Sequence, residues 1–448
     1  MNEKYLSIAV ITSIGISLLS PTLVLAKSKE PQLPDKFPPN PLEIKKEDPL
    51  LPSAAPKESL TRQERKQLEA ALDDLNQQAI TKFETGDKPG AFDVWNREIR
   101  LRRYLGIIPE IQALSRVGAI AWRQNNRQQV FYITQRLQNI QKNQTKSKSK
   151  SKSKNRNQEI NSQEISSQVN NSQLEILQAL GEAYQQVRTP KEALQVYDLV
   201  LLIVKERRDT AQEIEVLNTI GKLHLAWFDY NKAAATYEEL LGLANTRGED
   251  TERVKYLEEL AYIYEKAQQP QKSLNVRRKL TQIYSQGNNQ SNNQLDTQLN
   301  TQPDTQLKLS ALKIAIGSDY ESLAKKNPAF LDEAFKNYQE AYIIAWKLQQ
   351  YVRAGEALQK LIALYSSQGQ MEEALQTNKI LIETARKAAN LYNLMSAYDQ
   401  IAKLYLQRQD YPQAMEAFQQ GLQLARQLQH QEKYFTEEIN KLSSKINN

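Results

Sequence analysis

A helical pattern that returns about every forty residues constrains this chain more than any other feature. The clearest copy runs from Leu217 to Leu240, with the sequence LNTIGKLHLAWFDYNKAAATYEEL. In its first half, apolar residues recur at spacings of three and four, which places them on one face of a helix. A polar turn then leads into a second stretch with the same spacing. The pattern predicts a helical hairpin.

Small and aromatic residues recur at fixed places in the neighbouring copies. Gly221 stands where the two helices must cross closely, and Tyr237 is large enough to fill the gap beside it. Forty residues earlier Gly181 and Tyr197 take these places, and forty residues later Arg277 replaces the tyrosine. A Leu–Gly–x–x–Tyr core followed by Ala and an aromatic residue resembles the tetratricopeptide repeat, a helix–turn–helix unit of about 34 residues. The chain resembles a longer variant of it.

Eight copies can be placed between about residues 65 and 430, each marked by the small residue of its first helix. The markers are Ala79, Gly118, Gly181, Gly221, Ala261, Gly317, Ile362 and Ala402. The first, second and seventh copies are degenerate, with Ile362 replacing a small residue and with Thr134 and Asn378 where the aromatic is expected. The resemblance implies an all-α fold, an α-solenoid in which about eight antiparallel helix pairs form a right-handed superhelix, with disordered inserts.

Breaks in the period divide the chain into segments. We expect a signal peptide at 1–26, a Pro-rich linker at 27–60, repeats one and two at 61–141, a Lys/Ser-rich insert at 142–172, repeats three to five at 173–285, an Asn/Gln-rich insert at 286–307, and repeats six to eight with a capping helix at 308–448. The inserts lack apolar residues to bury, so we expect disorder there. The linker is expected to act as a semi-extended tether. A Pro-x-x-Pro ligand at Pro31–Pro34 or Pro38–Pro41 is the alternative.

Residues 1–26 have the pattern of a secretory signal peptide. Lys4 precedes an apolar run, and Val24-Leu25-Ala26 ends in a small-x-small cleavage pattern. We therefore expect Sec-type export to the periplasm or another extracytoplasmic space, an internal lumen included. An uncleaved membrane anchor is the alternative, because the span from Tyr5 to Ala26 approaches the roughly 20 residues that cross a bilayer.

The net charge of +7 describes one short insert. Seven basic residues and no acidic one lie between Lys142 and Arg156, so the rest of the chain is close to neutral. No aromatic residue interleaves these lysines, which argues against nucleic acid as a partner. A solvated loop is the simpler interpretation, and attachment of Lys146–Arg156 to an anionic membrane or envelope surface is the alternative. Solvated side chains are also expected for the four arginines along the end of the first repeat's second helix, Arg97, Arg100, Arg102 and Arg103, and binding of an anionic partner is the alternative.

The residues for common catalytic chemistry are scarce. The chain has no cysteine and two histidines, and His224 stands where the repeat has its tyrosine. No metal-binding histidine pair, phosphate loop or nucleophile elbow is present, so we expect neither an enzyme nor a cofactor or metal site. The alternative is a hydrolase of an envelope polymer that uses paired carboxylates, although the sequence singles out no pair.

The resemblance also implies a concave wall lined by the first helices. Positions −6, −3, +1 and +4 from each marker share one stripe of a helix. The candidate protein-binding groove comprises Trp122, Gln178, Glu182, Asn218, Lys222, Glu258, Tyr262 and Glu265. Mixed polar residues with aromatic anchors suit an extended peptide or a partner helix. The wall is too acidic for the Lys-and-Asn carboxylate clamp that some members of the family carry. The sequence thus predicts an exported scaffold that binds other proteins.

Overall fold

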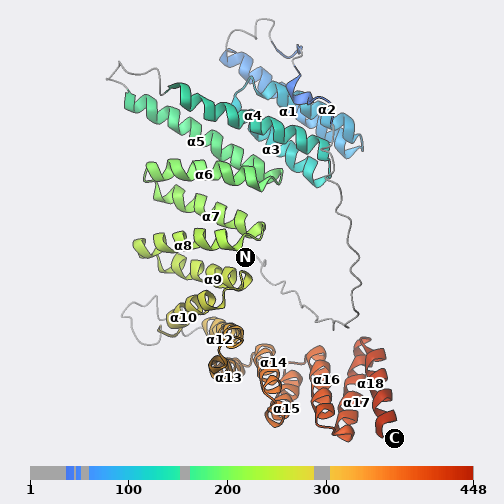
Figure 1. Ribbon diagram of the computed structural model, residues 1–448. Helices are drawn as coiled ribbons and strands as arrows, with labels where there is room; N and C mark the ends of the chain where they lie inside the picture. The colour runs from blue at the N-terminus through green and yellow to red at the C-terminus, as the bar shows by residue number, and fades with distance from the viewer. Residues whose placement is uncertain (1–36, 45–46, 52–59, 152–161, 287–302, 447–448) are drawn as a thin grey trace, which may run out of the picture.

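The computed structural model describes residues 37–44, 47–51, 60–151, 162–286 and 303–446. These ranges contain 17 α-helices and no strand. Figure 1 shows the helices stacked in chain order along an open curve, from α1 through α10 and then on to α18. The predicted signal peptide at 1–26 and the central parts of the two long inserts lie outside the described residues.

The helices form eight consecutive pairs and a final single helix. The pairs are α1 (Arg62–Glu84) with α2 (Lys88–Arg102), α3 (Ile107–Arg123) with α4 (Arg127–Ser151), α5 (Ser162–Gln186) with α6 (Pro190–Glu206), α7 (Thr210–Ala226) with α8 (Tyr230–Arg247), α9 (Asp250–Lys266) with α10 (Pro270–Gln286), α12 (Pro303–Ala324) with α13 (Leu331–Lys347), α14 (Tyr351–Ser367) with α15 (Met371–Lys387), and α16 (Leu391–Gln407) with α17 (Tyr411–Leu428), followed by α18 (Glu432–Ile446). Each of the eight marker residues lies in the first helix of a pair, so the predicted repeat frame is confirmed.

Short turns with a repeated geometry set the helices antiparallel. After α6, Arg208 takes the left-handed conformation with φ 58°, and Asp209 then accepts a hydrogen bond from the Gln212 amide. Phe228 and Asp229 do the same between α7 and α8, with φ 59° at Phe228. A left-handed residue satisfies the last carbonyls of one helix, and the aspartate caps the first amides of the next. The turn therefore ends one helix and starts another within three residues.

The small marker residues let the two helices of a pair lie close together. A Cβ atom added at Gly181 would lie 2.7 Å from Tyr197 Cζ, and one added at Gly221 would lie 2.7 Å from Tyr237 Cε2. Both tyrosines are buried, with 6 % and 3 % of their surface exposed. The interpretation of glycine as the crossing point and tyrosine as the filler is correct in these copies.

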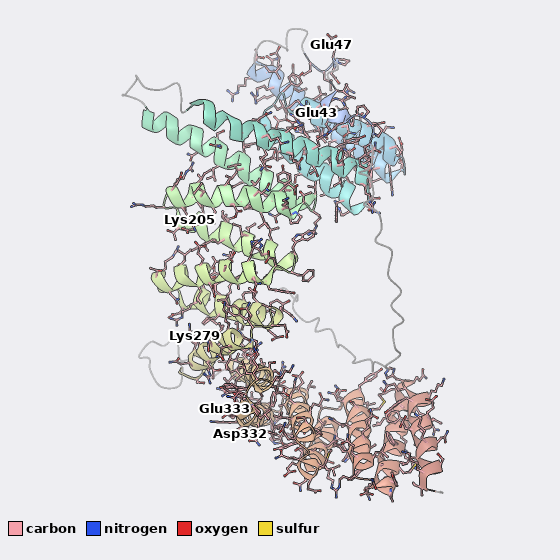
Figure 2. The ribbon with its side chains drawn as sticks, in the orientation of Figure 1. Glu43, Glu47, Lys205, Lys279, Asp332 and Glu333 are labelled. Carbon is pink, nitrogen blue, oxygen red and sulfur yellow. The ribbon has the colours of Figure 1, made fainter. Side chains whose placement is uncertain are left out.

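The Pro-rich segment packs against the array, so the prediction of a free tether is wrong for its described part. We call residues 37–44 and 47–51 the N-terminal strap. Its 3₁₀ turn η1 (Pro41–Glu43) buries Leu42 completely. Arg100 and Arg103 donate hydrogen bonds to the Pro41 and Leu42 carbonyls over 2.8 and 2.5 Å. Proline cannot donate, but its carbonyl still accepts, and these arginines supply the donors that a helix or sheet would have given. Figure 2 shows the strap residues Glu43 and Glu47 at the end of the array formed by α1 and α2.

The arginines on α2 are engaged by other groups, which corrects the prediction of a solvated face. Arg97 forms a two-pronged ion pair with Asp48 of the strap, with both N–O distances 2.8 Å. This pairing lowers the pKa of the Asp48 carboxyl. Arg102 pairs with Glu98 and Asp73 over 2.9 and 2.7 Å. The acids that hold these arginines come partly from another segment, which a reading of one helix does not reveal.

The helices extend into both predicted inserts. Helix α4 continues to Ser151 and α5 begins at Ser162, so both ends of 142–172 are helical where we expected disorder. This stretch contains neither glycine nor proline, and nothing in it stops a helix that is already formed. Helix α12 similarly begins at Pro303, inside the predicted insert 286–307, with proline at a first-turn position. Disorder at 152–161 and 287–302 stays a prediction, because these residues lie outside the described ones.

Candidate protein-binding surface on the first helices

The eight predicted groove residues all come from first helices, α3, α5, α7 and α9. Trp122 and Tyr262 are the large apolar ones, and each has 48 % of its surface exposed. Glu182, Lys222, Glu258 and Glu265 are exposed, whereas Gln178 and Asn218 are half-buried. The structure therefore leaves most of this set open to solvent, and their role in binding a partner stays a prediction.

Polar contacts join neighbouring first helices across this surface. The Asn218 side chain on α7 donates a 3.1 Å hydrogen bond to the Tyr256 hydroxyl on α9. Lys308 on α12 forms a 3.1 Å ion pair with Glu258 on α9. Direct contacts also join α3 to α5 and α12 to α14. These contacts join α3 to α5, α7 to α9, α9 to α12 and α12 to α14.

Two of the predicted acidic residues already have partners within the chain. Glu258 accepts a hydrogen bond of 2.6 Å from the Tyr284 hydroxyl in addition to its ion pair with Lys308. Glu265 pairs with the buried Arg277, the arginine that replaces a filler tyrosine in the fifth copy. A partner that used either carboxylate would have to compete with these contacts. Glu182 and Lys222 are therefore the better candidates for charged recognition.

Tyr262 presents a ring with a cation above it. The Lys266 ammonium lies 5.4 Å from the centre of the Tyr262 ring, one helical turn along α9. Such a pair keeps the aromatic face oriented while leaving its edge in water. The ring provides a flat apolar contact on α9.

Trp122 borders a cavity of about 390 Å³. It is lined by Trp122, Asn125, Arg127, Val130, Phe131 and Thr134. Thr134 occupies the position of Tyr197 and Tyr237, sixteen residues after the marker glycine, so the filler ring is missing in the second copy. The Thr134 hydroxyl is buried without a hydrogen-bond partner. In this copy Val187 and Ile133 lie against the marker glycine instead of a ring: a Cβ atom added at Gly118 would lie 2.4 Å from Val187 Cγ1 and 3.5 Å from Ile133 Cγ2.

The sequence did not lead us to Phe131, which is 45 % exposed on α4 and forms one wall of this cavity. It lies on a second helix, outside the stripe used to choose candidates. The available signal was the departure of Thr134 from the repeat pattern, because it indicates that this helix pair packs differently from its neighbours.

No metal centre emerges from the described ranges, where no group of three or more His, Asp or Glu side chains could ligate an ion. A search of the same ranges found no helix with the length and apolar character of a membrane span. His224 is half-buried, and its Nδ1 lies 4.0 Å from Asp229.

Comparison with known proteins identifies the repeat type. Residues 176–211 and 397–432 match one family model of the tetratricopeptide repeat, and residues 214–247 match another. No curated protein matches the chain.

Solved structures with a similar arrangement share little sequence with the chain. Aspartyl phosphate phosphatase F from Bacillus subtilis has 16 % identity and a TM-score of 0.39, over 75 % of this chain and 78 % of that one. A Signal Transduction ATPase with Numerous Domains protein with a tetratricopeptide repeat sensor, from Pyrococcus horikoshii, has 14 % identity and a TM-score of 0.38, over 85 % and 56 %. BtubC from P. vanneervenii has 14 % identity and a TM-score of 0.36, over 55 % and 91 %.

The matched segments correspond to the third, fourth and eighth helix pairs, α5–α6, α7–α8 and α16–α17. These are the copies whose glycine, alanine and aromatic positions follow the repeat most closely. The fold itself follows from the helices, and the repeat type follows from the family models. The chain therefore carries tetratricopeptide repeats within an array of eight helix pairs.

Proposed function

We propose that this protein is a scaffold that binds an extended peptide or a partner helix along the surface of its first helices. The observation that carries the proposal is the exposure of Trp122 and Tyr262, 48 % each, on first helices. The other exposed side chains of α9 are mainly charged. Large aromatic residues that remain half-exposed within a polar surface are the usual anchors of a protein interface.

Affinity in this proposal comes from a few anchors and many weak contacts. Burial of an aromatic hot-spot side chain contributes about 2 kcal/mol or more, which is roughly a thirtyfold change in affinity. Lys222 and Glu182 have opposite charges on adjacent repeats, so they would orient a partner rather than hold it.

The experiment compares capture of partners by surface variants. The tagged full chain is purified with its bound proteins, which are quantified by mass spectrometry for wild type and for Trp122→Ala, Tyr262→Ala and Lys222→Glu. The matched control is Leu202→Ala, because Leu202 is 54 % exposed but lies on the second helix α6. We expect the surface variants to retain roughly thirtyfold less of a common partner and the control to retain it fully. Unchanged capture by all three variants would show that the partner binds elsewhere.

We further propose that the scaffold acts outside the cytoplasm, after export directed by residues 1–26. Cell fractionation and N-terminal sequencing of the native protein test this directly. A mature chain that starts at Lys27 supports export with cleavage, and retention of Met1 on a soluble cytoplasmic protein contradicts it. A second experiment deletes residues 146–156. If wild type associates with the envelope in a salt-sensitive way and the deletion removes that association, the basic insert is the attachment point.

A further inference from the structure

The N-terminal strap lies on a positively charged face formed by two second helices, α2 and α4. We call this face the strap seat. Its side chains bond to carbonyl and carboxylate oxygens of the strap, and the strap inserts Leu42 as a fully buried apolar anchor. Extended proline-containing peptides are recognised in this way, by a groove that takes an apolar side chain and bonds to the backbone beside it. The seat residues that bond to the strap are Arg97, Arg100, Arg103, Tyr132 and Arg136.

Contacts within the helical array hold the seat in place. Glu110 of α3 accepts hydrogen bonds from the Arg136 guanidinium over 2.7 and 3.0 Å, and its carboxylate lies 3.2 Å from Arg103 Nε. The Glu110 side chain is buried, with 2 % of the residue exposed. Because these contacts do not involve the strap, the guanidinium groups of the seat would stay oriented when the strap leaves.

The seat carries more positive charge than the strap neutralises. Two of its four guanidinium groups pair with strap carboxylates. Among the described residues Arg100 makes no ion pair, and its guanidinium donates instead to the Pro41 carbonyl over 2.8 Å. Burial and the nearby Arg103 guanidinium lower the pKa of Arg100, as expected for a cation without its own counter-charge. A ligand with one more carboxylate would therefore suit this seat better than the strap does.

The strap also leaves part of its seat unfilled. An open cavity of about 480 Å³ is lined by three prolines of the strap, Pro41 among them, and by array residues that include Phe92 and Tyr132. Pro41 thus borders the cavity and contacts the Arg100 guanidinium through its carbonyl. A longer acidic side chain at this position would have both room and a counter-charge.

We propose that the strap seat is a second binding site, which takes an extended segment of another protein with a leucine next to proline and with acidic side chains for the arginines. The strap occupies this site within its own chain as the weaker ligand, and the partner binds by displacing it. Arg97 and Arg136 bind carboxylates of the partner as they now bind those of the strap, and Arg100 binds an additional one. The site lies on second helices and does not depend on the first-helix surface proposed above.

A synthetic peptide tests this site in the full chain. The probe is a fluorescent peptide of residues 37–51, and its binding is followed by anisotropy. Leu42→Ala weakens the chain's own strap, so we expect this variant to bind the probe roughly thirtyfold more tightly than wild type, in which the strap competes. Asp48→Lys, which opposes Arg97 with a positive charge, is an independent release variant, and Ile44→Ala is the control that should match wild type. Absence of binding to both release variants, or equal binding of a scrambled probe, would overturn the proposal.

Charge exchange separates recognition from general attraction between opposite charges. In the Leu42→Ala background, Arg97→Glu should weaken binding of the probe about tenfold, and a probe with Asp48→Arg should restore it. A probe with Pro41→Glu should bind several-fold more tightly than the original probe and lose this gain against Arg100→Gln. A missing rescue, or a gain that persists without Arg100, contradicts the assignment of these arginines.

Light scattering decides whether the occupant is a second copy of this chain. Wild type is measured with and without an excess of the probe, and we expect an oligomeric state that the probe does not change. A dimer that the probe dissociates would show that the strap of a second copy takes the seat, and it would overturn the assignment of the site to another protein.

Discussion

Thr134 and Asn378 occupy the same place in their copies, sixteen residues after the marker, and replace the filler aromatic with different results. At Thr134 the first helix keeps its glycine, and Val187 and Ile133 lie against that glycine in place of the ring. At Asn378 the first helix carries Ile362 in place of the small residue, and the added volume on one side offsets the loss on the other. Asn378 is completely buried, and neither its amide nitrogen nor its carbonyl oxygen has a hydrogen-bond partner.

Asn378→Leu should therefore stabilise the seventh helix pair. Leucine has a volume similar to that of asparagine and lacks its two unpaired polar atoms. A buried polar group without a partner costs about 1–3 kcal/mol. Hydrogen exchange of the α15 amides, which reports the free energy of local opening, should slow. Gln376→Leu on the exposed face of α15 is the control, with an expected effect within about 0.5 kcal/mol. Faster exchange in Asn378→Leu would mean that the asparagine has a partner that the packing does not reveal.

The two glycines of the fourth pair should respond to alanine in opposite directions. Gly221→Ala places a Cβ atom 2.7 Å from Tyr237 Cε2 and must displace a buried ring, so we expect destabilisation by about 1–3 kcal/mol. Gly242 is an exposed residue of α8, and an added Cβ atom would have nothing within 4 Å. Alanine at this position should therefore stabilise the helix by up to about 1 kcal/mol. Hydrogen exchange of α7 and α8 distinguishes the two, and equal effects would refute the packing argument.

His224 should make the fourth pair weaker in acid. Burial lowers the pKa of its imidazole below the ordinary value of 6.5, so the folded state favours the neutral ring. As the pH falls below 6.5, the unfolded chain takes up the proton first, and stability declines until the folded pKa has also been passed. His224→Tyr restores the repeat's aromatic and removes this decline. Thermal unfolding at pH 7.5 and pH 5.0 should show a smaller difference for the variant than for wild type, and equal differences would exclude His224 as the source.

At the scale of elements, the N-terminal strap is the part held by contacts rather than by its own secondary structure. Leu42→Ala removes a fully buried side chain, for which losses of about 2–5 kcal/mol are typical. We expect the strap to detach while the helices stay folded, so limited proteolysis between residues 37 and 60 should accelerate with no change in helical content. Ile44→Ala, two residues away and 50 % exposed, should leave cleavage unchanged. Cleavage at wild-type rate in Leu42→Ala would show that the arginine contacts suffice.

The sequence predicted the elements that depend on local spacing and missed those that depend on distant partners. The eight markers located every helix pair, because a filler such as Tyr237 and its glycine are sixteen residues apart in one copy. The strap was not predicted, since its attachment to Arg97 and Arg103 depends on carbonyls and a carboxylate from a segment with no periodicity. Among the candidate site residues, spacing predicted the exposure of Trp122 and Tyr262. Spacing did not predict the ion pair between Glu265 and Arg277, because it joins the first helix α9 to the second helix α10.

At the scale of the whole molecule, the array should lose stability from its ends inward. Helix α18 buries Phe435 completely against α17, next to Gly421 and Phe418. Because a repeat is stabilised mainly by its neighbours, Phe435→Ala should increase hydrogen exchange in α16 and α17 and leave α3 to α6 unchanged. Ile446→Ala on the same helix is 48 % exposed and serves as the control. A uniform increase along the entire chain would indicate a single cooperative unit instead.

The strap also imposes an order on biosynthesis. Its hydrogen bonds to α4 join residues more than ninety positions apart, as Asn40 does with Tyr132, whereas each helix pair closes over about forty residues. On a ribosome the strap emerges before every helix that it touches, and α4 is the last of these helices to be made. A nascent chain therefore exposes the strap during the time needed to translate two repeats, and in that interval other factors have access to it.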